Sequence, residues 1–316
     1  MLSRTAFNLF WMARQLERAE NTARLLDVGA RITLLPNSAE GFRNEWDALL
    51  RASGTAQMFL DRYGTPASDS IQEFLFFDRD NPSSVVNCLT NARESGRIVR
   101  TALTSQVWDA LNGAYQDLRA LSARRNRDLG EMSDFVTRAV LGIHGAIIGT
   151  QLRNDGWHFM QLGYGLERAD ATARILDVKY YVLLPRIEFL GGRVDHYQWQ
   201  VILRALSLHR AFHWAYGGAI TAAKVADFLI MNRESPRSLR TSIEQSLGHL
   251  DALATRYGDE APHVARDRAR RMLAALEARD VDEIFDFGLH EYLTAFIGDV
   301  ADVAMQVHAD YFGGRP

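Results

Sequence analysis

The chain has 316 residues, of which 47% are hydrophobic, and its formal net charge is -3. That length suffices for a large core or for two domain-sized units, and the near-neutral charge gives no reason to expect binding to nucleic acid or to a membrane surface. Cys88 is the single cysteine, which excludes a disulfide within the chain and a zinc site built on cysteines.

Targeting signals are also missing from the sequence. The N-terminus has no basic segment followed by an apolar run and a cleavage site, and the longest apolar runs are too short to span a bilayer. We therefore expect a cytoplasmic protein without a signal peptide.

Apolar residues recur with the helical period along most of the chain, and clean period-2 alternation is absent. The pattern predicts an all-α protein. Asn81 is the expected N-cap of the longest helix, with Pro82 as its first residue. Pro36 and Pro185 are expected to end two helices, and a turn is expected at Gly191-Gly192. In chain order, the expected helices cover about residues 3–35, 41–63, 68–77, 81–126, 129–152, 154–184, 197–216, 218–231, 236–257, 263–278 and 282–312.

One segment of the sequence occurs twice. Residues 16–28, LERAENTARLLDV, return 150 positions later as residues 166–178, LERADATARILDV. Trp46 then matches Trp199, and the Asn81-Pro82 pair matches Ser235-Pro236. The order of these matches predicts two diverged repeats related by a pseudo-twofold axis. The repeats would cover residues 1–152 and 153–316, and would form one continuous helical bundle.

Each repeated segment carries a charged stripe along one helix face. At about 100° per residue, positions i, i+3, i+7 and i+10 point the same way. Apolar residues flank each stripe on both sides, so we expect the stripes to be at least partly buried, whereas Gln15 and Arg18 are expected to face solvent. The stripes consist of Glu17, Glu20, Arg24 and Asp27 in the first repeat, and of Glu167, Asp170, Arg174 and Asp177 in the second.

Two interpretations of the stripes remain open. The first is a structural salt-bridge network, in which Arg24 and Arg174 meet carboxylates of the opposite repeat. The second is a polar site between helices, because six carboxylates against two arginines leave negative charge that could attract a metal, an amine or an arginine from elsewhere.

Arg93, Arg97 and Arg100 form a second one-faced set, which has no basic counterpart in the second repeat. This face could bind a ligand or partner, neutralise the acidic stripe, or simply be solvated. His209 and His213 stand four residues apart but lack the zinc-protease motif, and packing explains them better. His144 and His290 lie in apolar contexts typical of core residues, and no nucleotide-binding or nucleophile motif appears.

The repeated segment resembles the bacterial alpha-E family, an all-helical group of unknown function. Further matches are residues 11–14 (WMAR), residues 77–84 (FDRDNPSS), residues 92–94 (ARE) and the second copy through Pro185. The resemblance implies association with a circularly permuted ATP-grasp ligase and often a transglutaminase-like peptidase. We therefore expect an accessory or substrate-presenting subunit of an ATP-dependent system that makes or modifies peptides.

ATP and Mg²⁺ are expected on the partner ligase, and no cofactor or metal is expected in this chain. One alternative is an enzyme whose site lies between the stripes. Glu17 or Glu167 would then serve as general acid or base, or as a metal ligand, with Arg24 or Arg174 orienting a carboxylate. A purely structural scaffold that forms a homodimer is a further alternative.

Overall fold

The computed structural model describes residues 1–32, 41–124, 128–183, 193–258 and 263–313. Within those ranges the chain forms fifteen α-helices, one 3-10 turn and no strand, which confirms the all-α prediction. The helices are α1 (Ser3–Ile32), α2 (Gly41–Ser53), α3 (Ala56–Tyr63), α4 (Ser68–Phe76), α5 (Val85–Ile98), η1 (Arg100–Ala102), α6 (Ser105–Ser122), α7 (Leu129–Thr150), α8 (Asp155–Leu183), α9 (Arg193–Ala205), α10 (His209–Tyr216), α11 (Ala222–Ile230), α12 (Leu239–Tyr257), α13 (Val264–Glu277), α14 (Val281–Phe287) and α15 (Leu289–Tyr311).

Some sequence expectations fall outside these ranges. The helix-ending prolines Pro36 and Pro185 and the Gly191-Gly192 turn are not among the described residues. Among the helices that are described, none combines the length and the apolar character needed to pass through a membrane.

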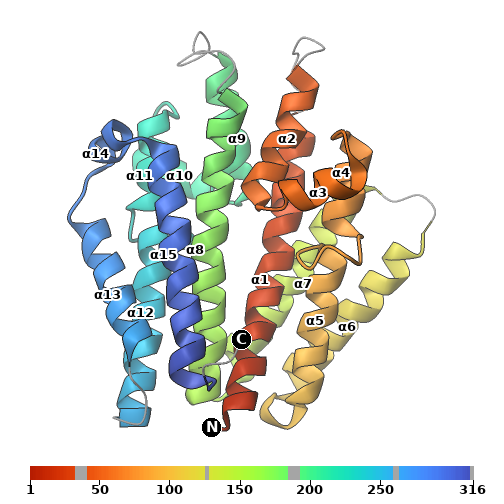
Figure 1. Ribbon diagram of the computed structural model, residues 1–316, viewed down its shortest axis with the longest axis vertical. Coiled ribbons are helices and arrows are strands. Elements are labelled where there is room, and N and C mark those ends of the chain that lie inside the picture. Colours follow the sequence, from red (N-terminus) through yellow and green to blue (C-terminus); the bar gives the residue numbers. More distant parts are fainter. Residues whose placement is uncertain (33–40, 125–127, 184–192, 259–262, 314–316) are drawn as a thin grey trace.

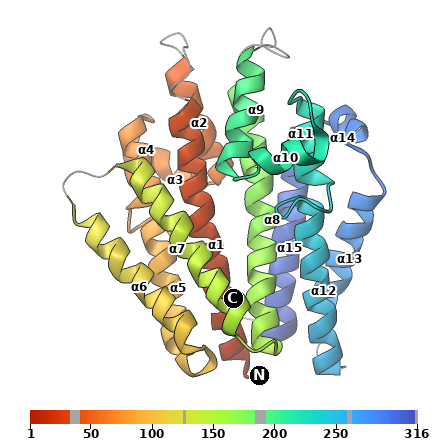
Figure 2. The same ribbon diagram turned by 180° about the vertical axis from the view of Figure 1, so that it is seen from behind.

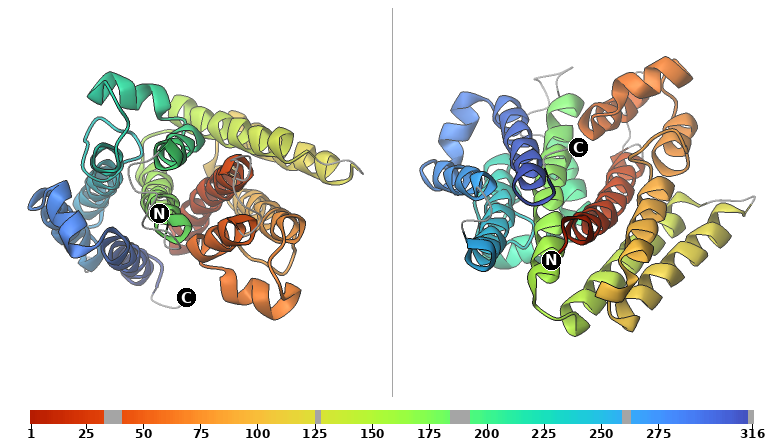
Figure 3. Two further views of the ribbon diagram at one scale, coloured as in Figure 1. Left: turned by 90° about the horizontal axis from the view of Figure 1, so that it is seen from above. Right: turned by 60° about the horizontal axis from the view of Figure 1, so that its bottom comes forward.

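Two long helices, α1 and α8, lie side by side at the centre of the molecule (Figure 1). α5 and α7 also pack on α1, and α7 crosses the back of the molecule (Figure 2). α12 and α15 pack on α8. Seen from above, the two groups of helices lie on opposite sides of the central pair (Figure 3). Contacts also cross between the groups, because α2 packs on α8 and α9 packs on α1.

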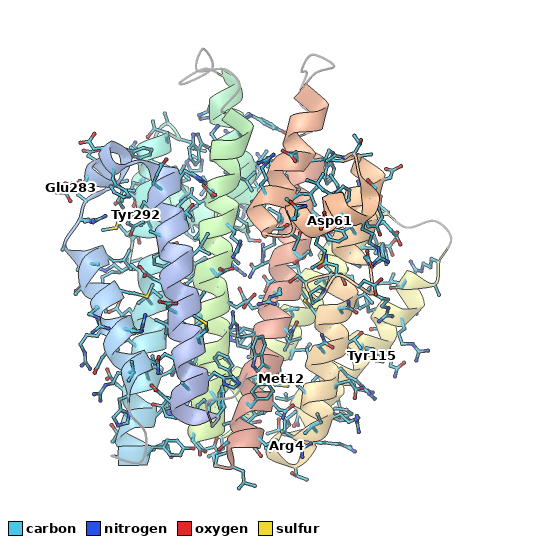
Figure 4. All side chains as sticks on the ribbon, in the orientation of Figure 1. Arg4, Met12, Asp61, Tyr115, Glu283 and Tyr292 are labelled. Atoms are coloured by element: carbon cyan, nitrogen blue, oxygen red, sulfur yellow. The ribbon has the colours of Figure 1, made fainter. Side chains whose placement is uncertain are left out.

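The central helices are buried on nearly all sides, and the charged side chains in their buried parts have ionic partners. Met12 of α1 is fully buried, and side chains fill the space around it (Figure 4). The two backbones approach closely at Gly163, where an added Cβ would lie 2.4 Å from the carbonyl oxygen of Phe10. This close approach brings the charged segments of α1 and α8 within reach of each other.

Two predicted helices are each broken at one point. The helix expected over residues 41–63 is divided into α2 and α3 at Gly54, whose φ is +72°. The helix expected over residues 197–216 is divided into α9 and α10 near Ser207, whose φ is +61°. A residue in the left-handed region cannot continue a right-handed helix. The apolar period resumes with little shift after each break, so periodicity did not reveal it.

The helix predicted over residues 81–126 was wrong in its start and its length. It consists of α5, η1 and α6, and α5 and α6 pack against each other. The N-cap of α5 is Ser84, whose side chain accepts from the Asn87 N–H. Asn81 instead shapes the preceding loop, where its amide donates to the Phe74 carbonyl at 3.0 Å. The last predicted helix also divides, at Gly288 with φ +109°.

Helices that the repeat hypothesis pairs have similar lengths. α1 and α8 have 30 and 29 residues, α2 and α9 have 13 each, α3 and α10 have 8 each, and α4 and α11 have 9 each. Ser84 and Ser238 are N-caps at matching places, before α5 and α12. The predicted boundary between residues 152 and 153 falls in the turn between α7 and α8. The duplication and its pseudo-twofold axis stay predictions.

Candidate functional site

The sequence contains two Glu-Arg dipeptides, Glu17-Arg18 on α1 and Glu167-Arg168 on α8. Each glutamate pairs with the arginine of the other dipeptide. Glu17 is fully buried and accepts from Nε and Nη2 of Arg168 at 3.0 and 2.9 Å. Glu167 accepts from Nε and Nη2 of Arg18 at 2.6 and 3.1 Å. Such two-point guanidinium–carboxylate pairs are strong and geometrically specific, so the two dipeptides hold α1 and α8 in one register.

A further arginine closes the group around Glu17. Arg237, from the segment before α12, donates to Glu17 at 3.1 Å and to Glu20 at 2.7 Å, and it is almost fully buried. Arg24 donates to Glu20 at 2.8 and 2.6 Å, and its Nη1 reaches Ser207 at 3.0 Å. We call Glu17, Glu20, Arg24, Arg168 and Arg237 the first charged site.

The corresponding group around Glu167 has a different composition. Arg14 joins Arg18 in pairing with Glu167, through Nε at 2.8 Å and Nη2 at 2.7 Å. Asp170 accepts from Nε and Nη2 of Arg174 at 2.7 and 3.1 Å. We call Glu167, Asp170, Arg14, Arg18 and Arg174 the second charged site.

The second charged site borders a cavity that opens to solvent. The side chains of Asp170 and Arg174 are 20% and 31% exposed, and Arg174 rests against the turn after α2, where its Nη1 reaches the Ala52 carbonyl at 3.3 Å. A cavity of about 200 Å³ lies beside them. Its lining consists of Arg18, Asn21, Thr22, Leu25, Ala52, Ser53, Thr55, Leu75, Ser83, Glu167, Asp170, Ala171, Arg174 and Ile175.

The absence of a side chain at Gly54 leaves space for the Arg174 guanidinium. A Cβ at Gly54 would lie 2.9 Å from Nη1 of Arg174, and the residue adopts φ +72°. Glycine therefore serves both the turn between α2 and α3 and the close approach of the guanidinium.

Both buried glutamates stay ionised. Burial alone would raise the pKa of Glu17, but the charges of Arg168 and Arg237 outweigh it and lower that pKa to about 2. Burial also opposes ionisation of Glu167, and the charges of Arg18 and Arg14 lower its pKa to about 2. A general acid needs a pKa near the working pH. These carboxylates are therefore suited to pairing and binding rather than to proton transfer.

The stripes are at least partly buried, as predicted. Of the two interpretations that the sequence left open, the structure shows paired charges, but the partners assigned to Arg24 and Arg174 were wrong. Arg24 and Arg174 pair with carboxylates of their own helices, at i,i+4 spacing. The arginines that cross between α1 and α8 are Arg14, Arg18 and Arg168. Arg18 had been expected in solvent because its Cα direction diverges from the stripe. Its long side chain bends back to Glu167 and is 27% exposed.

Other expected positions lie apart from this network. Gln15, also expected in solvent, is half-buried. Asp27 pairs with Arg31 at 2.7 Å near the end of α1. Asp177 is buried and its Oδ1 lies 2.8 Å from Nδ1 of His290, so this histidine is a hydrogen-bond partner of a carboxyl group rather than an apolar core residue.

The basic face, which lies on α5 and η1, does not neutralise the acidic stripes. Arg93 lies over the rings of Trp108 and Tyr115, at 5.7 and 5.2 Å from their centroids, on the side of the molecule where Figure 4 labels Tyr115. Arg97 is 57% exposed and pairs with Glu94 at 2.7 Å. The cations that neutralise the stripes come from α1, α8 and the segment before α12.

Histidine packing accounts for the remaining candidates. The rings of His209 and His213 pack edge to face at 4.8 Å, and the ring of His144 lies 4.5 Å from that of Tyr164. Among the residues that the structure describes, no group of three or more His, Cys, Asp or Glu side chains is placed to hold a metal ion.

The paired Glu-Arg dipeptides correspond to the defining feature of a known family. The Alpha-E family model, described as a predicted α-helical domain with a conserved ER motif, matches residues 1–312. The chain belongs to the Alpha-E family. In this Alpha-E protein the motif occurs on both central helices, and the structure shows each copy pairing with the other.

Known relatives of this Alpha-E protein are longer. Uncharacterized proteins from Mycobacterium bovis and from two strains of Mycobacterium tuberculosis are 23% identical to it over 339 residues. The alignments cover 98% of this chain but 37% of each relative, so the chain spans little more than a third of their length. No solved structure matches the chain.

Three arginines of the network were missing from the sequence prediction. Arg14 and Arg168 lie within or next to the repeated segment. The prediction considered the stripe arginines, the basic face and an unspecified arginine from elsewhere, and it named none of these three residues as a partner. Arg237 was detectable in principle. In the predicted repeats, the match of Asn81-Pro82 with Ser235-Pro236 places Arg237 opposite Ser83, so only one of the two positions is an arginine.

Proposed function

We propose that this Alpha-E protein is an accessory subunit that presents substrate to an ATP-grasp ligase in a system that forms peptide-type amide bonds. The observation that carries the proposal is the contrast within the charged sites. The glutamates of both ER motifs are ionised and paired with arginines, whereas the second charged site borders a solvent-open cavity. We infer that the paired glutamates and arginines hold the helices in place, while the cavity at the second charged site binds a ligand. The family resemblance supplies the identity of the ligase, and a transglutaminase-like peptidase is the second partner it implies.

The length of the mycobacterial relatives supports a role alongside other protein. In each of them the matched region is 37% of the chain, so further sequence accompanies the Alpha-E region. A unit that is joined to additional sequence in its relatives is suited to work beside another protein unit.

Recovery of the ligase from native cells tests this proposal. The tagged chain is expected to recover an ATP-grasp ligase, identified by mass spectrometry, and its addition to the purified ligase should increase ATP-dependent amide formation. Arg97→Glu reverses a charge on the exposed basic face, and Arg51→Glu makes the same change at another exposed position. Loss of recovery with the first variant alone would place the ligase on the basic face.

Two results would overturn the proposal. The first is that the folded chain neither recovers the ligase nor changes its rate. The second is that the purified chain forms the amide product alone, which would favour an enzyme with a carboxylate/arginine site.

A further inference from the structure

The two charged sites differ at one matching position. Ser84 and Ser238 are the N-caps of α5 and α12, and they lie 154 positions apart in the sequence. The residues just before them, Ser83 and Arg237, are therefore placed alike. Arg237 extends into the first charged site and contacts Glu17, Glu20 and Asn21. Ser83 is too short to reach so far, and it lines the cavity of the second charged site.

The cavity thus lies where an arginine would be if the second site were built like the first. Its volume of about 200 Å³ is large enough for several water molecules or a ligand the size of a small amino acid. Hydroxyl groups of Thr22, Ser53, Thr55 and Ser83 are among its lining side chains, and they can donate to or accept from the polar parts of a ligand.

The carboxylates beside this cavity already have cationic partners, so the cavity is not a cation site. Arg14 supplies a second guanidinium to Glu167 at 2.7 Å, and Arg174 occupies both oxygens of Asp170. The second charged site holds two carboxylates and three guanidiniums, which gives a formal charge of 3 − 2 = +1. The site therefore favours a bound group with a single negative charge.

The cavity also offers donors for such a charge. Arg18 uses its Nε and Nη2 for Glu167, and within the described part of the chain its Nη1 has no hydrogen-bond partner. The Arg18 and Arg174 side chains are 27% and 31% exposed, and both line the cavity. Guanidinium groups bind carboxylates through parallel hydrogen bonds. A phosphate monoester carries almost two charges at neutral pH, which exceeds the charge of the site and would meet Glu167 and Asp170.

We propose that the cavity bounded by Arg18, Arg174 and Ser83 binds the carboxylate of a free amino acid or of a peptide C-terminus. Arg18 and Arg174 hold the carboxylate, and the hydroxyl groups contact the adjoining polar atoms. Carboxylate binding stands on the geometry alone, and only its identification as the substrate presented to the ligase rests on the proposed function.

Titration of the purified chain, without any partner, tests this inference. Glycine and glycylglycine are added while backbone amide shifts are followed by NMR, and glycylglycinamide serves as the matched probe without a carboxylate. We expect shifts at cavity residues with the first two probes, and binding of the amide roughly tenfold weaker or worse. A preference between glycine and glycylglycine distinguishes a free amino acid from a chain end.

Two variants locate the site. Ser83→Arg should fill the cavity as Arg237 fills the first site and abolish binding, while Ser105→Arg adds the same charge at an exposed position and should bind like wild type. Arg174→Gln removes a cation without filling the cavity, and it answers the same question if Ser83→Arg does not fold.

Three outcomes would overturn the inference: no shifts with either carboxylate probe, equal binding of the amide, or stronger binding of inorganic phosphate or guanidinium. None of these depends on recovery of a ligase, so failure here and failure of the proposed function remain distinguishable.

Discussion

Glu17 of α1 accepts two hydrogen bonds from Arg168 of α8, at 3.0 and 2.9 Å. The reverse pair, Glu167 with Arg18, forms beside it. Buried ion pairs are weak evidence for stability, because desolvation opposes their attraction, but removing one partner leaves an uncompensated charge. We therefore interpret the two reciprocal Glu–Arg pairs as interactions that fix how α1 and α8 are aligned.

Removal of the Arg237 guanidinium should lower the free energy of unfolding. Arg237→Met keeps much of the side-chain volume but deprives Glu17 and Glu20 of a buried cation, so we expect a loss of about 3–5 kcal/mol in the free energy of unfolding. Urea denaturation measures this. Arg31→Met is the control, because its pair with Asp27 is 46% exposed on the arginine side and should contribute no more than about 1 kcal/mol. Equal losses in the two variants would contradict this role.

The coupling between Glu17 and Arg168 can be measured separately. In a double-mutant cycle of Glu17→Gln and Arg168→Gln, we expect a coupling free energy of about 0.5–3 kcal/mol, because the two side chains share two hydrogen bonds. The same cycle with Glu17→Gln and Arg31→Gln should be additive within roughly 0.5 kcal/mol. Additivity in the first cycle would show that the exchange between the ER motifs carries no interaction energy.

Stability should fall in acid through both ER glutamates. Their pKa values in the folded protein are lowered from 4.5 to about 2, so the stabilisation is complete above the unfolded pKa and is lost as the pH falls from about 5 toward 2. The loss is at most about 3 kcal/mol for each glutamate. This loss can be measured as a fall in the urea midpoint between pH 7 and pH 3. Glu17→Gln should make the midpoint depend less on pH. An unchanged slope in that variant would assign the acid sensitivity to other groups.

The sequence was sufficient to predict the helical class and the buried stripes, because both depend on the local period of apolar residues. It was not sufficient to predict partners. Arg18 lies about 100° around the helix from Glu17, yet its side chain is long enough to reach Glu167 across the helix interface. Arg237 is distant in sequence from both stripes, so only the folded chain shows that it contacts Glu17.

The breaks within helices were missed for a related reason. Gly54 and Ser207 adopt positive φ values of +72° and +61°, and each ends a helix whose apolar pattern continues on the other side. A glycine in a helical pattern is often tolerated, and a serine carries no strong signal for this conformation. The cavity depends on the break between α2 and α3, because the turn at Gly54 lies against the Arg174 side chain.

The close approach of the central helices gives a last prediction. A Cβ at Gly163 would lie 2.4 Å from the Phe10 carbonyl oxygen and 3.2 Å from the Ala13 Cβ, so Gly163→Ala must push α1 and α8 apart. We expect a loss of about 1–3 kcal/mol in urea denaturation. Gly142→Ala is the matched control, because nothing lies within 4 Å of its Cβ position on α7, and it should stabilise the helix by roughly 0.5–1 kcal/mol. If Gly163→Ala also stabilised the protein, the contact between α1 and α8 at this point would have to be looser than the structure shows.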